Sequence, residues 1–127
     1  MSSKIPSRSA KALRRLEARY AELKRALLPI GYILPGTVIK RWMPCGKPSC
    51  RCAAGPRHHH GPYYQWSLAL RGKPITRRLT ADHAKSYQEW TENNRKVRRI
   101  LSQMRQTSMQ AANHHAPFAI VDKRPQK

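Results

Sequence analysis

Three cysteines and three histidines lie within one short stretch, residues 44–64, which reads PCGKPSCRCAAGPRHHHGPYY. Three thiols and one imidazole are a common tetrahedral zinc set. The stretch is rich in Gly and Pro and almost lacks aliphatic side chains, so burial cannot hold it in shape. A bound metal ion would do so, because the free energy of metal binding becomes folding free energy. We therefore expect a metal-stapled segment, called the knuckle below (residues 44–60).

The spacing of the candidate ligands is Cys45-x4-Cys50-x-Cys52-x7-His60. It departs from the usual C-x2-4-C spacing of zinc fingers and ribbons, although a tight turn lets a Cys-x-Cys pair chelate. The alternative is a loop with three free thiols. A disulfide is disfavoured, because three cysteines leave one unpaired and the sequence shows no sign of secretion.

The fourth ligand is open among His58, His59 and His60 on spacing alone. His60 is favoured, because Gly61-Pro62 follows it directly and must turn the chain into the next strand.

The run CGKPSCRC…HGPYYQW…GKPITRRLT resembles a family of short bacterial proteins with a CGKxxCxC…HGPYY core, a following hairpin and a long C-terminal helix. The resemblance covers residues 36–101 and implies metal ligation by Cys45, Cys50, Cys52 and His60. It also implies a genomic position near transposases and other mobile elements. The family has no well-defined activity, so the function has to be argued from the residues.

Composition points to a polyanionic partner. The chain has 127 residues, with 26 Lys and Arg against 6 Asp and Glu, a formal net charge of +20. Such an excess creates a strong positive field whose usual partner is nucleic acid. A membrane is disfavoured, because no segment is long and apolar enough to span one. No secretory signal is visible, and we expect a reducing, cytoplasmic location.

A helix is expected over residues 9–28, with Ser9 as its N-cap. Its apolar residues recur at spacings of three and four: Leu13, Leu16, Tyr20, Leu23 and Leu27. Residues 29–36 break this helix. Among its many basic residues, Arg14 and Arg15 are predicted phosphate contacts, with a plain solvated face as the alternative.

Three strands follow, over residues 37–43, 63–70 and 74–79, and Arg71-Gly72-Lys73 is a tight-turn signal. The knuckle joins the first two strands. A second helix is capped by Thr80 and runs from residue 81 to about 110. The fold class is therefore α+β: a small antiparallel sheet flanked by two helices that pair as a coiled-coil-like hairpin, or with copies in a homodimer.

The second helix has its own apolar stripe. Its members are Tyr87, Trp90, Asn94, Val97, Leu101 and Met104, with Asn94 either fixing the register or facing water. The predicted organisation is a disordered N-terminus (1–8), a helix (9–28), a zinc-knuckle β domain (37–80), a long helix (81–112) and a flexible basic tail (113–127).

Catalysis is not expected. The six carboxylates form no recognisable cluster of the kind that metal-dependent nucleases need. The predicted ligands use up the thiols, and no Gly-rich phosphate loop is present.

Binding fits the sequence better, because Arg and Lys hold phosphates and exposed aromatics stack on bases. Besides Arg14 and Arg15, the predicted contacts are Lys40, Arg41, Lys47, Arg51, Arg57, Tyr63, Arg71, Lys73, Arg77 and Arg78. Trp66 and Tyr64 are expected in the core, since they lie on the same face of the strand as Leu68 and Leu70.

The sequence thus predicts a non-enzymatic, zinc-stapled nucleic-acid-binding protein, with DNA ahead of RNA, that assists a mobile-element recombinase or transposase. One alternative is an RNA-binding or ribosome-associated basic protein. Another is an adaptor that docks a protein partner through the heptad helices.

Overall fold

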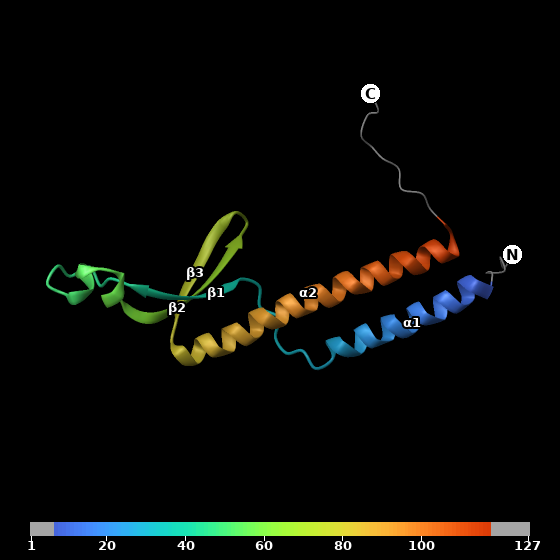
Figure 1. Cartoon of the computed structure of the whole chain (residues 1–127), viewed down its shortest axis with the longest axis horizontal. Helices are drawn as coiled ribbons and strands as arrows, with labels where there is room; N and C mark the ends of the chain where they lie inside the picture. The colour runs from blue at the N-terminus through green and yellow to red at the C-terminus, as the bar shows by residue number, and fades with distance from the viewer. Residues whose placement is uncertain (1–6, 118–127) are drawn as a thin grey trace, which may run out of the picture. The chain divides into compact units, whose positions relative to one another are not determined.

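The computed structural model describes residues 7–117 and has an α+β fold, as the sequence predicts (Figure 1). The elements, in chain order, are α1 (Ser7–Leu27), β1 (Thr37–Met43), η1 (Arg51–Ala54), η2 (Pro56–His58), β2 (His60–Leu70), β3 (Lys73–Leu79) and α2 (Ala81–His115). The strands form one antiparallel sheet in the order β1-β2-β3, and the sheet lies between the two helices in the chain. The chain divides into two compact units, with the boundary inside α2.

The first unit pairs α1 with the part of α2 that begins at Arg98. Its core consists of Leu13 and Leu23 from α1 and of Ile100 and Thr107 from α2. Two hydrogen bonds show that the helices run antiparallel: Ser9 Oγ lies 3.3 Å from His114 Nδ1, and Arg19 donates to Gln103. Figure 1 shows the two helices side by side in this unit. We call this pair the hairpin.

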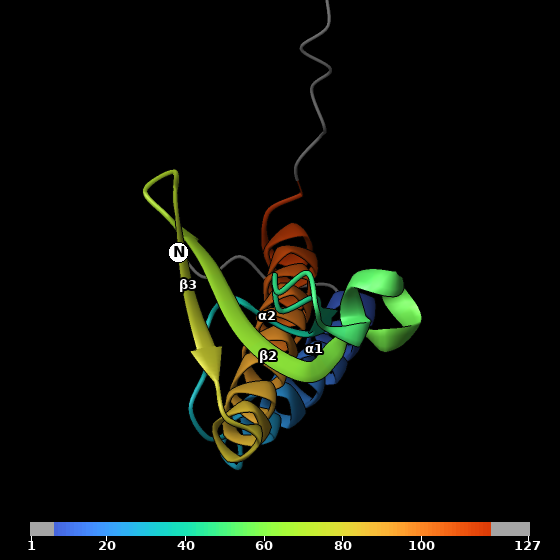
Figure 2. The same ribbon diagram turned by 90° about the vertical axis from the view of Figure 1, so that its left-hand side faces the viewer.

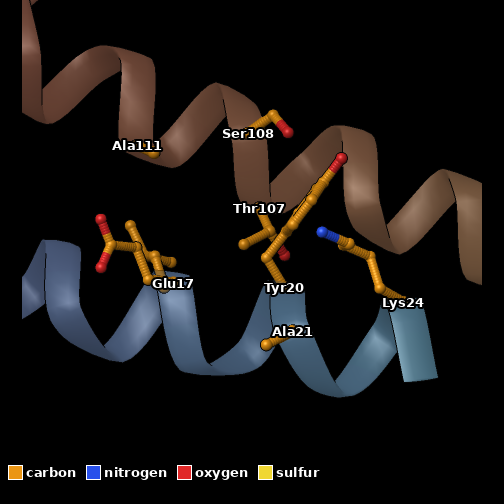
Figure 3. A pocket seen from close by; sticks show the side chains of 8 residues that line it. Glu17, Tyr20, Ala21, Lys24, Thr107, Ser108 and Ala111 are labelled. Atoms are coloured by element: carbon orange, nitrogen blue, oxygen red, sulfur yellow. The ribbon is translucent and has the colours of Figure 1, made fainter. Parts of the chain in front are cut away.

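An apolar groove follows one side of the hairpin (Figure 3). Its walls are Leu16, Glu17, Tyr20, Ala21 and Lys24 of α1 and Thr107, Ser108 and Ala111 of α2. Figure 3 shows the Tyr20 ring standing between the helices, with the Lys24 ammonium beside it; the ammonium lies 6.0 Å from the ring centroid.

One expectation for the helices needs correction. Ser9 is not the N-cap, because α1 already begins at Ser7 and Ser9 bonds His114 instead. The predicted antiparallel pairing of the two helices is confirmed, and it involves the part of α2 from Arg98 on. The helices differ in length: 21 residues make a helix of about 30 Å, against about 50 Å for the 35 residues of α2.

The second unit, Ile30–Val97, joins the sheet to the first half of α2. Strands β2 and β3 are linked by a two-residue turn, Arg71-Gly72, in which both residues have positive φ. This is the turn geometry that matches the twist of paired strands. Strand β2 is longer than predicted, since it begins at His60 rather than Tyr63, and it bends as it runs into the knuckle (Figure 2). A bulge interrupts its pairing with β1 between Arg41 and Met43.

Aromatic side chains join the sheet to α2 within this unit. The Trp66 ring meets Tyr87 edge-on at 5.9 Å, and Tyr87 lies 5.6 Å from Trp90. The indole N–H of Trp66 also donates to the Pro35 carbonyl. Leu79 at the end of β3 and Ala84 in the first turns of α2 are both buried. Trp66, which was expected in the core, is half-buried and packs against Tyr87 of α2.

The segment between α1 and β1 has no regular secondary structure, but hydrogen bonds attach it to α2. Its Leu34 N–H donates to the Trp90 carbonyl at 3.0 Å, and the Asn93 amide donates to the Tyr32 carbonyl at 3.0 Å. The ring of Tyr32 meets Trp90 edge-on at 5.3 Å. Asn93 thus makes the tertiary contact. Its neighbour Asn94, for which the sequence left a register role and a solvent-facing position open, is half-buried.

Thr80 caps α2 as predicted, since its Oγ1 accepts the His83 N–H at 3.2 Å. α2 then runs to His115, beyond the predicted end near residue 112. Of the predicted N-terminal segment, only residues 7 and 8 are described and they belong to α1; most of the predicted basic tail, from residue 118, lies outside the described residues. Neither described helix combines the length and apolarity that a membrane span requires.

Candidate metal centre and nucleic-acid interface

The four predicted ligands converge on one point. Cys45, Cys50, Cys52 and His60 each offer one donor atom, and these atoms all lie within 4.8 Å of one another. The Cys45 and Cys52 sulfurs are 3.4 Å apart, and the Cys50 sulfur lies 3.1 Å from His60 Nε2. The three cysteines are free thiols. The cluster could therefore bind a metal ion, and its histidine is His60 rather than His58 or His59.

Short elements of the knuckle bring these ligands together. Cys45 follows β1, Cys50 precedes the 3-10 turn η1, Cys52 lies within that turn, and His60 is the first residue of β2. Backbone hydrogen bonds fold the chain between them: Cys50 N–H donates to the Lys47 carbonyl and Ala53 N–H to the Cys50 carbonyl, each at 3.0 Å. The tight turns make the Cys-x-Cys pair usable as a chelate, which the sequence spacing left open.

The knuckle has almost no apolar interior. Cys52, which is 2 % exposed, is the one residue classed as buried in residues 44–60. Its sulfur accepts the Cys45 N–H at 3.3 Å, a contact that orients a ligand sulfur from outside the metal shell. Because so little is buried, the ligands themselves are the main candidates for holding this segment together.

The thiols differ in acidity. Hydrogen bonds from the Cys52 backbone and then from the His60 side chain lower the pKa of Cys50 to about 6. The Cys45 backbone lowers the pKa of Cys52, but burial and the neighbouring thiols outweigh it, so the net pKa of Cys52 is raised. At neutral pH the cluster thus presents Cys50 as a thiolate, the form that binds metals.

Gly61 is required directly after His60. A Cβ at this position would lie 2.8 Å from both the Arg41 carbonyl oxygen and Trp42 Cδ1, and the backbone has φ +148°. The close approach explains why the motif has glycine between the histidine and Pro62. It also ties the first residue of β2 to the bulge in β1.

The register of the sheet divides the predicted contact residues between two faces. Directly opposed residues in antiparallel strands point to the same side. One side, called the Tyr63 face, has Tyr63 opposite Arg41 and Gln65 opposite both Ile39 and Arg78. The other side, called the Trp66 face, has Trp66 opposite Val38 and Arg77, and Tyr64 opposite Lys40 and Leu79.

The predicted nucleic-acid contacts are therefore not gathered on one surface. Arg41, Tyr63 and Arg78 are on the Tyr63 face; Lys40 and Arg77 are on the Trp66 face; Lys47, Arg51 and Arg57 are in the knuckle; Arg71 and Lys73 are at the β2–β3 turn; Arg14 and Arg15 are on α1. All are exposed except Tyr63, which is half-buried. Gln65 and Ile39 of the Tyr63 face were not predicted, although their alternation with Tyr63 and Arg41 signals the shared side.

Charge is distributed unevenly along the chain. Residues 37–79, which comprise the sheet and the knuckle, contain nine Lys and Arg and no Asp or Glu. Five of the six acidic residues lie on the helices: Glu17, Glu22, Asp82, Glu89 and Glu92. Among the described residues, Arg19 pairs with Glu22 and Arg95 with Glu92, and both ion pairs lie within helices. The sheet and knuckle (residues 37–79) thus form a region that has basic but no acidic side chains, called the basic region below.

The chain belongs to a family defined by a domain of unknown function, DUF6788, whose profile matches residues 7–85. The match includes α1, the knuckle and the whole sheet, so it begins earlier and ends earlier than the resemblance over residues 36–101. No curated protein and no solved structure matches the chain significantly.

Proposed function

We propose that this DUF6788 protein is a non-enzymatic, zinc-stapled nucleic-acid-binding protein. The observation that carries the proposal is the basic region: residues 37–79 have nine cationic side chains and no anionic one, on an antiparallel sheet extended by the knuckle. An exposed, unneutralised set of Arg and Lys attracts phosphates and gains further from counterion release. Most such contacts position a nucleic acid without reading its sequence.

Zinc is the metal that the donor set favours. Three thiolates and one imidazole suit a tetrahedral zinc ion, in which ligand sulfurs about 2.3 Å from the metal are about 3.8 Å apart. The donor atoms, all within 4.8 Å of one another, are close to this arrangement. Calcium and magnesium prefer oxygen ligands and are disfavoured. Four protein ligands also fill a tetrahedral shell, which is typical of structural rather than catalytic zinc.

We place DNA ahead of RNA and propose a role as an accessory to a mobile-element recombinase or transposase. The support is the resemblance of the CGKPSCRC…HGPYY motif to proteins encoded near such elements. The absence of a carboxylate cluster in the basic region favours binding over strand cleavage, because metal-dependent cleavage needs converging carboxylates. In this role the protein would hold DNA while its partner performs the chemistry.

A competition titration tests the proposal. Labelled duplex DNA bound to the zinc-loaded full chain is challenged with unlabelled duplex DNA, single-stranded DNA and structured RNA at about 0.15 M salt. This salt is needed because a chain with net charge +20 binds any polyanion at low salt. Retained binding with preference for DNA supports the proposal. Preference for RNA supports the ribosome-associated alternative, and loss of all binding at this salt rejects a nucleic-acid function.

The groove of the hairpin favours a second candidate, a protein-interaction adaptor. Leu16, Tyr20 and Ala111 give this groove an apolar surface, and an amphipathic helix from a partner would fit such a surface. The test is light scattering on the complex of the chain with a candidate recombinase, before and after nuclease treatment. A complex that survives nuclease and is lost in Tyr20→Glu would support the adaptor, and a complex lost with nuclease would reject it.

A further inference from the structure

Tyr63 is the central aromatic residue of the Tyr63 face. Arg78 of β3 lies over its ring, with the guanidinium carbon 5.0 Å from the ring centroid. Arg41 of β1 is its direct cross-strand partner. Gln65, two residues further along β2, is opposite Arg78 and adds an amide to the same side. One flat ring is thus flanked by two guanidinium groups on neighbouring strands.

These groups are available to a ligand. Arg41 and Arg78 are exposed, and neither belongs to an ion pair within the described part of the chain. The aromatic packing with α2 uses the opposite face, through Trp66 and Tyr87. Tyr63 is therefore not part of the aromatic core that its neighbour Trp66 joins, and Ile39 beside it is 41 % exposed.

The chemistry of this set suits an unpaired nucleotide. Phosphates accept from Arg in a bidentate geometry, and exposed bases stack on tyrosine rings and on guanidinium planes. In a duplex the faces of the bases are covered by their neighbours, so a duplex could use only the charges. An amide such as that of Gln65 can bond the edge of a base that is no longer paired.

Resting on the proposed nucleic-acid function, we infer that the Tyr63 face binds a single-stranded segment. A base stacks on Tyr63 and Arg78, Arg41 and Arg78 hold the adjacent phosphates, and Gln65 contacts a base edge. The basic region would attract any nucleic acid, and the Tyr63 face would add a specific site for unpaired nucleotides. Such segments arise where strands separate during recombination.

The first test separates the ring from the charges. Wild type, Tyr63→Phe and Tyr63→Leu, all zinc-loaded, are titrated into labelled oligothymidine of about 16 nucleotides and into a duplex, at about 0.15 M salt. Tyr63→Phe should keep wild-type affinity, and Tyr63→Leu should weaken single-strand binding roughly tenfold, since one stacked base is lost. Duplex binding should change less than twofold with either variant. Equal affinity of all three proteins for oligothymidine would overturn the inference.

The second test uses a matched pair of double variants. Arg41→Ala with Arg78→Ala removes two charges from the Tyr63 face, and Lys40→Ala with Arg77→Ala removes two from the adjacent positions on the Trp66 face. The net charge is the same, so long-range attraction is matched. We expect the first pair to weaken oligothymidine binding at least tenfold more than the second and to reduce the single-strand salt slope by about 1.4. Equal losses of affinity in the two double variants would mean that the charges of both sheet faces contribute alike, which also overturns the inference.

The two proposals fail in different ways. If the wild type binds duplex DNA or RNA at this salt but Tyr63→Leu is neutral on every probe, the Tyr63 site is wrong and the nucleic-acid function stands. If the wild type binds none of the probes, the function itself is wrong. An oligouridine arm decides between DNA and RNA, because only RNA offers the 2′-hydroxyl.

Discussion

The hairpin and the knuckle are held together by different means. In the hairpin, Leu13, Leu23 and Ile100 bury their side chains between two helices. In the knuckle, one cysteine is buried, and four sulfur and nitrogen donors stand within 4.8 Å of one another. Burial of apolar surface stabilises the first region, whereas we propose that a metal ion bound to the four donors stabilises the second.

The charges differ in the same way. The helices combine their many basic residues with five acidic ones, while residues 37–79 contain nine basic residues and none that is acidic. Nine like charges on one small sheet and its knuckle repel each other, and a polyanion would relieve that repulsion. We therefore propose the sheet and knuckle as the first place for nucleic-acid binding, and we predict that each region can be disrupted without the other.

Removing the metal should have the largest effect and should act on one region. Zinc sites of this kind contribute about 10–16 kcal/mol of binding free energy. Treatment with a strong chelator, or Cys52→Ser, should abolish hydrogen-exchange protection in residues 44–60 while α1 keeps its protection. Metal analysis of the untreated protein should give about one zinc per chain. An intact knuckle in protein shown to be free of metal would contradict the account.

Leu23→Ala should give the reverse pattern. Leu23 is 5 % exposed in the hairpin, and truncating a buried leucine costs about 2–5 kcal/mol. The free energy of unfolding of the hairpin, followed by far-UV circular dichroism in urea, should fall by this amount with zinc stoichiometry unchanged. The control is Leu28→Ala, because Leu28 is 84 % exposed and its loss should cost less than about 0.5 kcal/mol.

Gly61→Ala tests the close packing between the start of β2 and β1, where the knuckle meets the sheet. Gly61 and Gly55 both have φ +148°, but an added Cβ clashes at Gly61 and has nothing within 4 Å at Gly55. Gly55→Ala should therefore cost only the backbone strain, about 1–3 kcal/mol, and Gly61→Ala should add a clash of about 1–3 kcal/mol. Denaturant unfolding of the zinc-loaded proteins measures both. Equal losses would remove the packing argument for the glycine in HGP.

Acid should act on the knuckle, with a smaller effect than the changes above. The pKa of Cys50 is lowered to about 6, so Cys50 favours the organised knuckle above its ordinary pKa and loses that contribution as pH falls through about 6. The raised pKa of Cys52 acts in the opposite direction. Zinc must displace the Cys52 proton near neutral pH and also the Cys50 proton below pH 6. The fall of log affinity per pH unit should thus be steeper below pH 6 than above it in a chelator competition, and a constant slope would argue against the hydrogen bonds to Cys50.

Periodicity and residue type predicted most of the architecture. The spacing of Leu13 and Leu23 identifies the seam of α1, and both are buried. Alternation and the Arg71-Gly72 signal predict the sheet and its turn. In α2, the pattern of bulky residues selected Leu101 and Met104, but the buried positions are Ala84, Thr91, Ile100 and Thr107. Two of these are threonines, which a search for bulky apolar side chains passes over.

The ligands were predictable from chemistry, but their surroundings were not. Cysteine and histidine are residue types that bind metals, and Gly61-Pro62 favoured His60 among three histidines that the spacing left open. The contact of Trp42 with Gly61 and the attachment of Leu34 to α2 depend on irregular chain segments without a repeating pattern. The division of Lys40 and Arg41 between two faces follows from strand alternation. Which face packs against α2 required the contact of Trp66 with Tyr87.

The most direct test of the central claim is a hydrogen-exchange map of the zinc-loaded chain, with and without saturating oligonucleotide, at about 0.15 M salt. The account predicts new protection in β1, β2, β3 and the knuckle, with the largest change around Tyr63, and weaker effects at Arg14 and Arg15 on α1. Protection confined to the helices, with the sheet and knuckle unchanged, would contradict it.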